Sequence, residues 1–386
     1  MPASSHPDRL PPDRSPRAHL TLLPGLLAFL TMGVLQAVYG PAFPAFERKF
    51  GVNTEGVALV ASVHFLGSAA APLLTGVALA HFSTRRVANA GLGILLIGVV
   101  LVALAPGWTL ALAGALTGGL GLGIVSAALN TAYASLGTRP SNTVNAVFGL
   151  GSLLSPLLVV ASAPQGLGVP FLVIAVLALF TLGAVSLWNV PEVPKHRTGQ
   201  AESGRVPLWI PLMFSLLLGT YVALEVGFGA WIATHLTGLN WTNPALIVSG
   251  YWAGLMIGRL LTGAFGARFQ PQRLVLGAVV SATLATLVTT LVPTLAAPLY
   301  LLAGLAVGPV FPTTLVWLSR EIPVRTVPFL LISGSLGGAV SPSLIGWTNA
   351  QYGSGSIPVA FLALAALLLL LVLVTQGLTR PANAGQ

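Results

Sequence analysis

A carboxylate stands among aromatic side chains in one long apolar stretch of this sequence, between Tyr221 and Trp231. Glu225 is the only acidic residue that we place well inside a predicted membrane span. A carboxylate at that depth costs about 2.5–3.5 kcal/mol on insertion scales, and such groups usually face a watery cavity or a bundle interior. Glu225 is therefore predicted to mark a path for a proton or a solute. The alternative is a buried acid that is hydrogen-bonded to a neighbouring helix.

Two side chains are candidates for carrying a proton. A carboxyl group that is withdrawn from water holds a proton more readily than one in water, so we expect Glu225 to couple proton movement to solute movement. His64, in an earlier apolar stretch, is the second candidate, because histidine titrates near neutral pH. The alternative for His64 is a histidine that is hydrogen-bonded within a packed span.

The composition excludes an ordinary soluble domain. Hydrophobic residues make up 55% of the 386 positions and charged residues only 6%, against about 25% charged residues in globular chains. The absence of cysteine excludes disulfides, thiolate metal sites and cysteine nucleophiles. The net charge of +9 does not indicate nucleic-acid binding, because the basic residues lie in short loops between apolar stretches.

Hydropathy predicts an all-α membrane protein. A span needs about 20 residues, and this length places twelve spans in the chain. Lysine and arginine gather in alternate loops, so the positive-inside rule puts both termini in the cytoplasm, with the protein in the inner or plasma membrane. The twelve predicted spans are residues 20–46, 56–81, 86–106, 109–136, 142–163, 168–189, 208–236, 244–268, 272–292, 296–320, 324–347 and 356–378.

The polar interruptions divide the chain into two halves of six spans. The longest of them, residues 190–207, is rich in proline and charge and is expected to be a flexible cytoplasmic linker. The predicted divisions are a disordered tail at 1–19, a six-helix bundle at 20–189, the linker at 190–207, a second bundle at 208–378 and a cytoplasmic tail at 379–386.

The two halves repeat each other. Residues 62–67, SVHFLG, align with residues 249–254, SGYWAG, and residues 73–76, LLTG, align with residues 260–263, also LLTG. Both alignments have an offset of 187 residues, and Ser155-Pro156 aligns with Ser341-Pro342 at an offset of 186. A parallel repeat of six spans places a solute site between two similar bundles, near the middle of the membrane.

Twelve spans, a repeat of six, and Gly76 and Gly263 followed by basic residues resemble the major facilitator superfamily over residues 20–378. The aspartate that accompanies the glycine in that superfamily's loop motif is absent from both halves. The stretch from Tyr221 to Trp231 is similar to the sugar-transporting branch related to fucose permeases, although the membrane acids expected in spans 1 and 4 of that branch are missing. The resemblance assigns gating to the motif residues and to a nearby arginine. These are Gly76, Arg85, Arg86, Arg259, Gly263 and Arg268.

The resemblance also implies that spans 1, 4, 7 and 10 line the cavity, where amide and aromatic side chains suit a neutral polyhydroxyl solute. Asn and Gln present a donor and an acceptor together, as hydroxyl groups do, and Trp and Tyr offer flat apolar faces with a polar edge. Each amide, taken singly, could instead join two helices. The predicted solute-binding residues are Gln36, Tyr39, Asn130, Tyr133, Asn142, Asn145, Tyr221, Trp231, Tyr251, Trp252, Thr313 and Trp317.

Breaks in two spans predict where the protein moves. Gly40, Pro41 and Pro44 interrupt the first span, and Gly308, Pro309 and Pro312 interrupt the tenth. Such breaks are tolerated where neighbours or a cavity satisfy the freed backbone groups. We expect both segments to bend during gating, and the alternative is a pair of simple kinks.

The expected function is secondary transport of a small neutral solute, most simply a sugar, by alternating access with proton symport. No P-loop or hydrolase motif is present, so the sequence indicates neither an ATP-driven pump nor an enzyme. We expect a monomer that binds a solute and a proton within the bilayer and needs no cofactor or metal. The alternatives are an antiporter that exports lipophilic drugs and a receptor that transports nothing.

Overall fold

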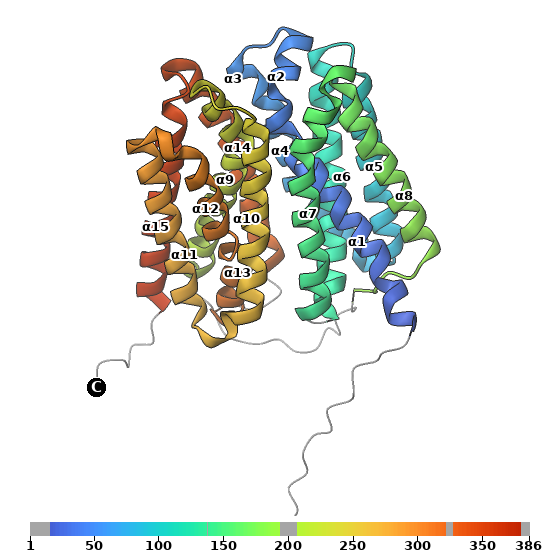
Figure 1. Cartoon of the computed structure of the whole chain (residues 1–386). Helices are drawn as coiled ribbons and strands as arrows, with labels where there is room; N and C mark the ends of the chain where they lie inside the picture. The colour runs from blue at the N-terminus through green and yellow to red at the C-terminus, as the bar shows by residue number, and fades with distance from the viewer. Residues whose placement is uncertain (1–15, 137, 194–206, 322–326, 380–386) are drawn as a thin grey trace, which may run out of the picture.

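The computed structural model of the chain describes residues 16–136, 138–193, 207–321 and 327–379. Fifteen α-helices occupy most of this part of the chain, and they form two bundles that stand side by side (Figure 1). We refer to α1–α8 as the N-half and to α9–α15 as the C-half. The predicted boundaries of the tails and the linker fall largely on residues outside the described ranges, and the division into two domains remains a prediction.

Helices of the N-half follow the predicted apolar stretches closely. The turn at residues 105–107, which is the least visible by hydropathy, separates two of them. The described part of the chain begins within α1, and residues 16–19 are helical. The bounds are α1 Pro16–Ala37, α2 Tyr39–Phe50, α3 Thr54–Val57, α4 Leu59–His81, α5 Thr84–Leu104, α6 Trp108–Ser135, α7 Thr138–Ser162 and α8 Gly168–Leu187.

Helices of the C-half repeat this arrangement, with one long helix for each predicted span except the tenth. The bounds are α9 Trp209–Gly238, α10 Pro244–Phe265, α11 Pro271–Leu291, α12 Ala296–Val307, α13 Val310–Glu321, α14 Val327–Tyr352 and α15 Ser356–Thr379.

Length and composition recover most of the twelve predicted spans within the part of the chain that the structure describes. Among the described residues, ten segments are long and apolar enough to cross a membrane, and the bent pair α1–α2 raises this to eleven. The segment outside that set is α14, which covers the predicted span 324–347. Several side chains at the start of α14 lie outside the described residues. Farther along this helix, Ser341 hydrogen-bonds to α9 and Ser343 to α4.

Proline produces the predicted breaks in the first and tenth spans. α1 and α2 meet at an angle of 50°, and the break at Val38 falls where the ring of Pro41 would strike the carbonyl of Ala37, one turn earlier. Pro44, which was also expected to interrupt the span, lies inside α2. In the tenth span, α12 ends at Val307 and α13 begins at Val310, on either side of Gly308-Pro309.

The sequence repeat has a structural counterpart in two matching hydrogen bonds. Ser155 of α7 donates from its hydroxyl to the backbone carbonyl of Val34 in α1, at 2.8 Å. Ser341 of α14 donates in the same way to the carbonyl of Ala223 in α9. Each Ser-Pro pair thus joins the fifth span of its half to the first, as expected for two halves that repeat each other.

Contacts between the halves lie in the middle of the helices and toward the end that carries α3. α14 packs on α4 and α3, α10 packs on α7, and α2 packs on α9. Toward the other end, Gly76 of α4 and Gly263 of α10 have open space beside them. The protein is therefore closed at the α3 end, while the opposite ends of these helices do not touch at the two glycines.

Candidate solute and proton site

Glu225 is ion-paired with Arg259. The two lie on neighbouring helices of the C-half, α9 and α10, and Nη2 of Arg259 is 3.1 Å from Oε1 of Glu225. The Glu225 side chain is 8% exposed and the Arg259 side chain 21%. Glu225 thus has a charged partner on a neighbouring helix. Arg259 was assigned to gating near a helix end, and the structure places its charge beside the buried acid.

Two tyrosines complete the cluster around this pair. Tyr221 lies one turn before Glu225 on α9, so both side chains are on the same face of the helix. Its buried hydroxyl lies close to both charges, without the geometry of a hydrogen bond to either. Tyr251 of α10 donates its hydroxyl to the backbone carbonyl of Glu225, at 3.3 Å. Four predicted site residues thus form one cluster.

A narrow cavity lies between the two halves. It is lined by Gln36 and Tyr39 from the bend between α1 and α2, by Phe65 of α4, and by Val226 and Trp252 of the C-half. Its volume is about 20 Å³. This volume is sufficient for one water molecule. Three predicted solute-binding residues, Gln36, Tyr39 and Trp252, therefore meet at one place.

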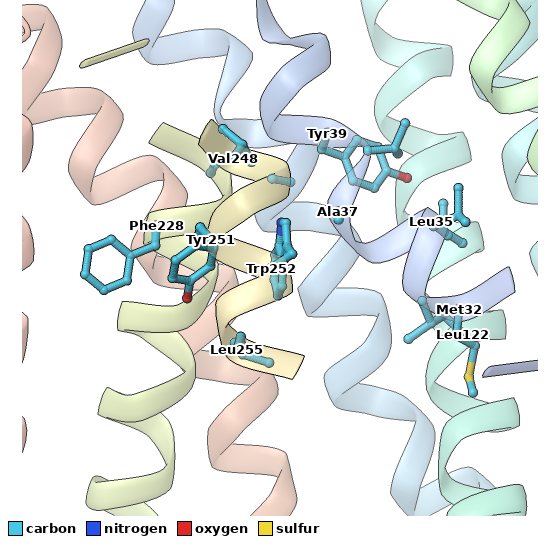
Figure 2. Close-up of a cluster of buried hydrophobic side chains, with 14 of the residues drawn as sticks. Met32, Leu35, Ala37, Tyr39, Leu122, Phe228, Val248, Tyr251, Trp252 and Leu255 are labelled. Carbon is cyan, nitrogen blue, oxygen red and sulfur yellow. The ribbon is translucent and has the colours of Figure 1, made fainter. Parts of the chain in front are cut away.

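Tyr251 and Trp252 are neighbours on α10, and their rings meet edge-on with centroids 5.2 Å apart (Figure 2). Tyr251 lies toward Phe228 of α9, with ring centroids 5.3 Å apart. Trp252 lies on the side that faces the N-half, and its indole N–H is buried without a hydrogen-bond partner among the described residues. A buried donor without a partner is costly, so this N–H is available to a hydroxyl group or a water molecule that enters the cavity.

Trp231 is part of the seam that closes the α3 end. Its ring packs on Phe43 of α2, with centroids 5.2 Å apart, and its indole N–H donates to the carbonyl of Pro342 in α14, at 3.1 Å. A Cβ atom at Gly40 would lie 2.4 Å from the Cα of Ala230, so only glycine permits α2 to approach α9 this closely. Trp231 is fully buried, and its contacts are with the seam between α2, α9 and α14 rather than with the cavity.

The amides of the N-half bond to each other. Nδ2 of Asn145 donates to Oδ1 of Asn130 at 3.2 Å, and Nδ2 of Asn130 donates to Ser126 at 3.1 Å. Both amides are half-buried, and the contact joins α7 to α6. Asn142 lies in α7, but its side chain is outside the described part of the structure.

Two other predicted residues of the N-half belong to its core. Tyr133 is buried against Phe29, with ring centroids 6.5 Å apart. His64 is buried against Tyr39, with centroids 4.9 Å apart. His64 thus lies in the N-half, whereas Glu225 lies in the C-half.

Thr313 and Trp317 lie on α13, inside the C-half. Trp317 is fully buried and packs edge-on against Phe214 of α9, with ring centroids 5.1 Å apart. Thr313 is 6% exposed. Neither residue lines the cavity between the halves described above.

The residues assigned to the superfamily motif lie on helices or pack locally. Gly76 and Gly263 lie inside α4 and α10, within the predicted spans 56–81 and 244–268. Arg85 donates to Oδ1 of Asn189 at 2.6 Å, within the N-half. Arg268 lies over the ring of Phe265, 5.7 Å from its centroid. Arg86 is exposed near the start of α5.

An acid from the predicted linker is bonded to the start of α5. Oε2 of Glu192 accepts a hydrogen bond from the backbone N–H of Thr84 at 2.9 Å, and the Thr84 hydroxyl accepts one from the N–H of Val193. A carboxylate at a helix start is favourable there. The first residues of the predicted linker are thus attached to the start of α5, a contact that the sequence analysis missed because Glu192 is 108 residues away.

Other residues of the site were also missed. Gly229 and Ala230 of α9 and Ala61 of α4 line the cavity, and they are small because the halves approach closely there. The signal for Gly229 was present in the sequence, since Gly227 and Gly229 flank Phe228 in a helix. For Ala61, one alanine among many, the sequence offered no signal.

The fold and the buried, charged site between helices define a membrane transporter. The sequence pattern of the Major Facilitator Superfamily matches residues 25–331. The chain therefore belongs to this superfamily, as the sequence predicted, and it is a multi-pass secondary transporter of small molecules rather than an enzyme.

Relatives of known structure or function agree with this assignment. The glucose/mannose transporter GlcP of Bacillus subtilis (strain 168) is 24% identical over 271 residues, which are 65% of this chain and 67% of GlcP. The crystal structure of a D-xylose-proton symporter superposes with a TM-score of 0.73 at 15% identity, covering 93% of this chain and 97% of the symporter. The crystal structure of the nucleoside transporter NupG gives a TM-score of 0.70 at 13% identity, covering 94% of this chain and 99% of NupG. The predicted similarity to sugar transporters is confirmed as a distant one.

Proposed function

We propose that the chain transports a hexose by alternating access and couples this to proton symport through Glu225. The observation that carries the proposal is the cavity between the halves, which Gln36, Tyr39 and Trp252 line together. An amide, a phenol ring and an indole with a free N–H match the hydroxyl groups and the apolar face of a sugar ring. The similarity to a glucose/mannose transporter supports the same solute class.

The cavity is too small for a hexose in this conformation, so binding requires the halves to separate around it. With both termini in the cytoplasm of a cell whose plasma membrane holds the protein, the closed α3 end faces outward. The conformation described here is then the inward-facing one. Alternating access would next close the ends near Gly76 and Gly263 and open the seam at Trp231.

The proposal is tested with purified protein and a panel of solutes. A ligand that binds the folded state stabilises it by mass action, by about 2.7 kcal/mol at one hundred times its Kd, and so raises the melting temperature. We expect D-glucose or D-mannose to raise the melting temperature, and uridine and tetraphenylphosphonium to leave it unchanged. Shifts with several lipophilic cations and none with sugars would instead indicate a drug antiporter.

The indole N–H of Trp252 provides the first prediction. Trp252→Phe removes this donor and keeps an aromatic ring, so it should weaken D-glucose binding by the value of one hydrogen bond, about 0.5–1.5 kcal/mol, or roughly 2- to 12-fold in Kd. Isothermal titration with purified protein measures the change. Trp347→Phe is the matched control, because Trp347 is 45% exposed on α14. Equal affinity in Trp252→Phe and the wild type would remove Trp252 from the site.

The seam provides the second prediction. The hydroxyls of Ser62 in α4 and Ser343 in α14 are 2.8 Å apart, and the chain has no cysteine. The double variant Ser62→Cys, Ser343→Cys should therefore form a cross-link that holds the α3 end closed. D-glucose uptake into proteoliposomes should fall to background on oxidation and return with dithiothreitol. Each single variant serves as the control, and full uptake by the cross-linked protein would show that this end does not open.

A further inference from the structure

Arg259 joins the buried acid to the break in the tenth span. Its Nη2 contacts Glu225 at 3.1 Å, and its Nε donates to the backbone carbonyl of Gly308 at 3.3 Å. In a continuous helix, the N–H of residue 312 would donate to that carbonyl. Residue 312 is proline and has no N–H. The guanidinium group therefore supplies the hydrogen bond that Pro312 cannot make.

Close packing holds Arg259 at this carbonyl. A Cβ atom at Gly308 would lie 2.4 Å from the carbonyl oxygen of Leu255, so glycine is needed for α12 to approach α10 at the break. The planar guanidinium group can then bind a carboxylate and a carbonyl on different edges at the same time, which a lysine ammonium on its flexible stem cannot reproduce.

The fold alone does not demand this charge pair. At the repeat offset of 187 residues, the positions equivalent to Glu225 and Arg259 in the N-half are Val38 and Pro72. The first and second spans of the N-half thus form the corresponding part of the fold without either charge. A buried ion pair in only one of two similar bundles points to a role other than packing.

We propose that Arg259 is a positioning residue that transmits the charge state of Glu225 to the break between α12 and α13. With Glu225 ionised, Arg259 is held between the carboxylate and Gly308, and the break keeps one geometry. When Glu225 takes up a proton, its attraction for Arg259 is lost, and the guanidinium group moves relative to Gly308. The lower segment of span 10, α13, then changes its angle to α12. This inference rests on the proposed role of Glu225 as the proton site.

The surroundings of Glu225 contain few other groups that titrate. Tyr221 and Tyr251 belong to the cluster itself, and His235, farther along α9, bonds to Tyr300 of α12 at 2.6 Å. The described parts of the helices that pack against α9 carry a few further ionisable side chains. They are Tyr39, Glu47, Arg48 and Lys49 on α2, Arg320 and Glu321 on α13, Arg268 just beyond α10, and Tyr352 on α14, while α15 has none.

Spin labels report the bend without knowledge of the solute. Because the chain has no cysteine, Leu212→Cys on α9 and Val316→Cys on α13 would carry the only two labels; both residues are about half exposed. Leu246→Cys and Leu302→Cys, on α10 and α12, form the control pair away from α13. Distances are measured by double electron–electron resonance on the full chain in lipid nanodiscs at pH 8 and pH 5.

We expect the 212–316 distance distribution to shift between pH 8 and pH 5 and the control pair to stay constant. Glu225→Gln should show the low-pH distribution at both pH values. Arg259→Lys keeps the positive charge, but a lysine cannot bind the Glu225 carboxylate and the Gly308 carbonyl at the same time. The change in the 212–316 distance between pH 8 and pH 5 should therefore disappear. Pro312→Ala keeps both charges and returns an N–H to the Gly308 carbonyl, and it should also remove the shift.

A pH shift that persists in both Arg259→Lys and Pro312→Ala, or no shift in the wild type, would overturn the inference. Either variant serves if the other does not fold. The proposed function fails separately: if no sugar stabilises the protein while the labels respond to pH, the link stands and the solute class is wrong. If Glu225→Gln abolishes proton-driven uptake while the labels do not respond to pH, the proton site stands and the link is wrong.

Discussion

Glu225→Gln should abolish proton-driven accumulation of D-glucose and leave exchange intact. A pH gradient of one unit is worth about 1.36 kcal/mol per proton, so a one-proton symporter can accumulate its solute about tenfold. Glutamine has nearly the shape of a protonated glutamate, and it cannot release a proton. The variant should therefore still bind the sugar and move between its conformations, but its uptake should stop at an accumulation ratio of about one.

Proteoliposomes separate the two activities. Accumulation is measured as radiolabelled D-glucose taken up under an imposed pH gradient, and exchange as counterflow at equal pH against unlabelled sugar inside. Glu55→Gln is the matched control, because Glu55 is an exposed acid in α3, and it should accumulate like the wild type. Accumulation that survives Glu225→Gln and is lost in His64→Gln would move the proton site to the N-half.

Sequence patterns were sufficient for the helices and for their breaks. The apolar stretches are long enough that each must be a helix in a membrane, and the prolines of spans 1 and 10 mark the positions where the backbone bends. The Ser-Pro pairs, which the sequence shows only as part of the repeat, make matching hydrogen bonds through Ser155 and Ser341.

The pairing of side chains between helices could not be predicted in the same way. Glu225 and Arg259 are 34 residues apart on two helices, and the periodicity of each helix does not say which faces meet. Asn130 and Asn145 were expected to bind solute, and they bond to each other, since amides serve both purposes equally well. Trp231 and Tyr133 were expected in the cavity because they are aromatic, but close packing placed both in contacts between helices.

The stability of the protein should show how strongly Glu225 and Arg259 depend on each other. Removing one partner of a buried ion pair leaves an unpaired charge and costs about 3–5 kcal/mol. Arg259→Met should be the more damaging single change, because it strands an acid whose side chain is 8% exposed. Glu225→Leu strands an arginine that is 21% exposed and retains the carbonyl of Gly308, so its cost should fall at or below the lower end of that range.

The double variant Glu225→Leu, Arg259→Met should be more stable than Arg259→Met alone, because apolar side chains of similar volume often replace a buried pair at little cost. Unfolding in mixed micelles with increasing denaturant measures all four corners of the cycle, and Glu55→Gln provides the reference for a change in charge at the surface. Costs that simply add would mean that the two charges are stabilised independently. Recovery of stability without recovery of accumulation would instead mean that the pair is kept for its charge. The N-half packs without either charge at Val38 and Pro72. A C-half that packed equally well without the pair still could not carry a proton at this position.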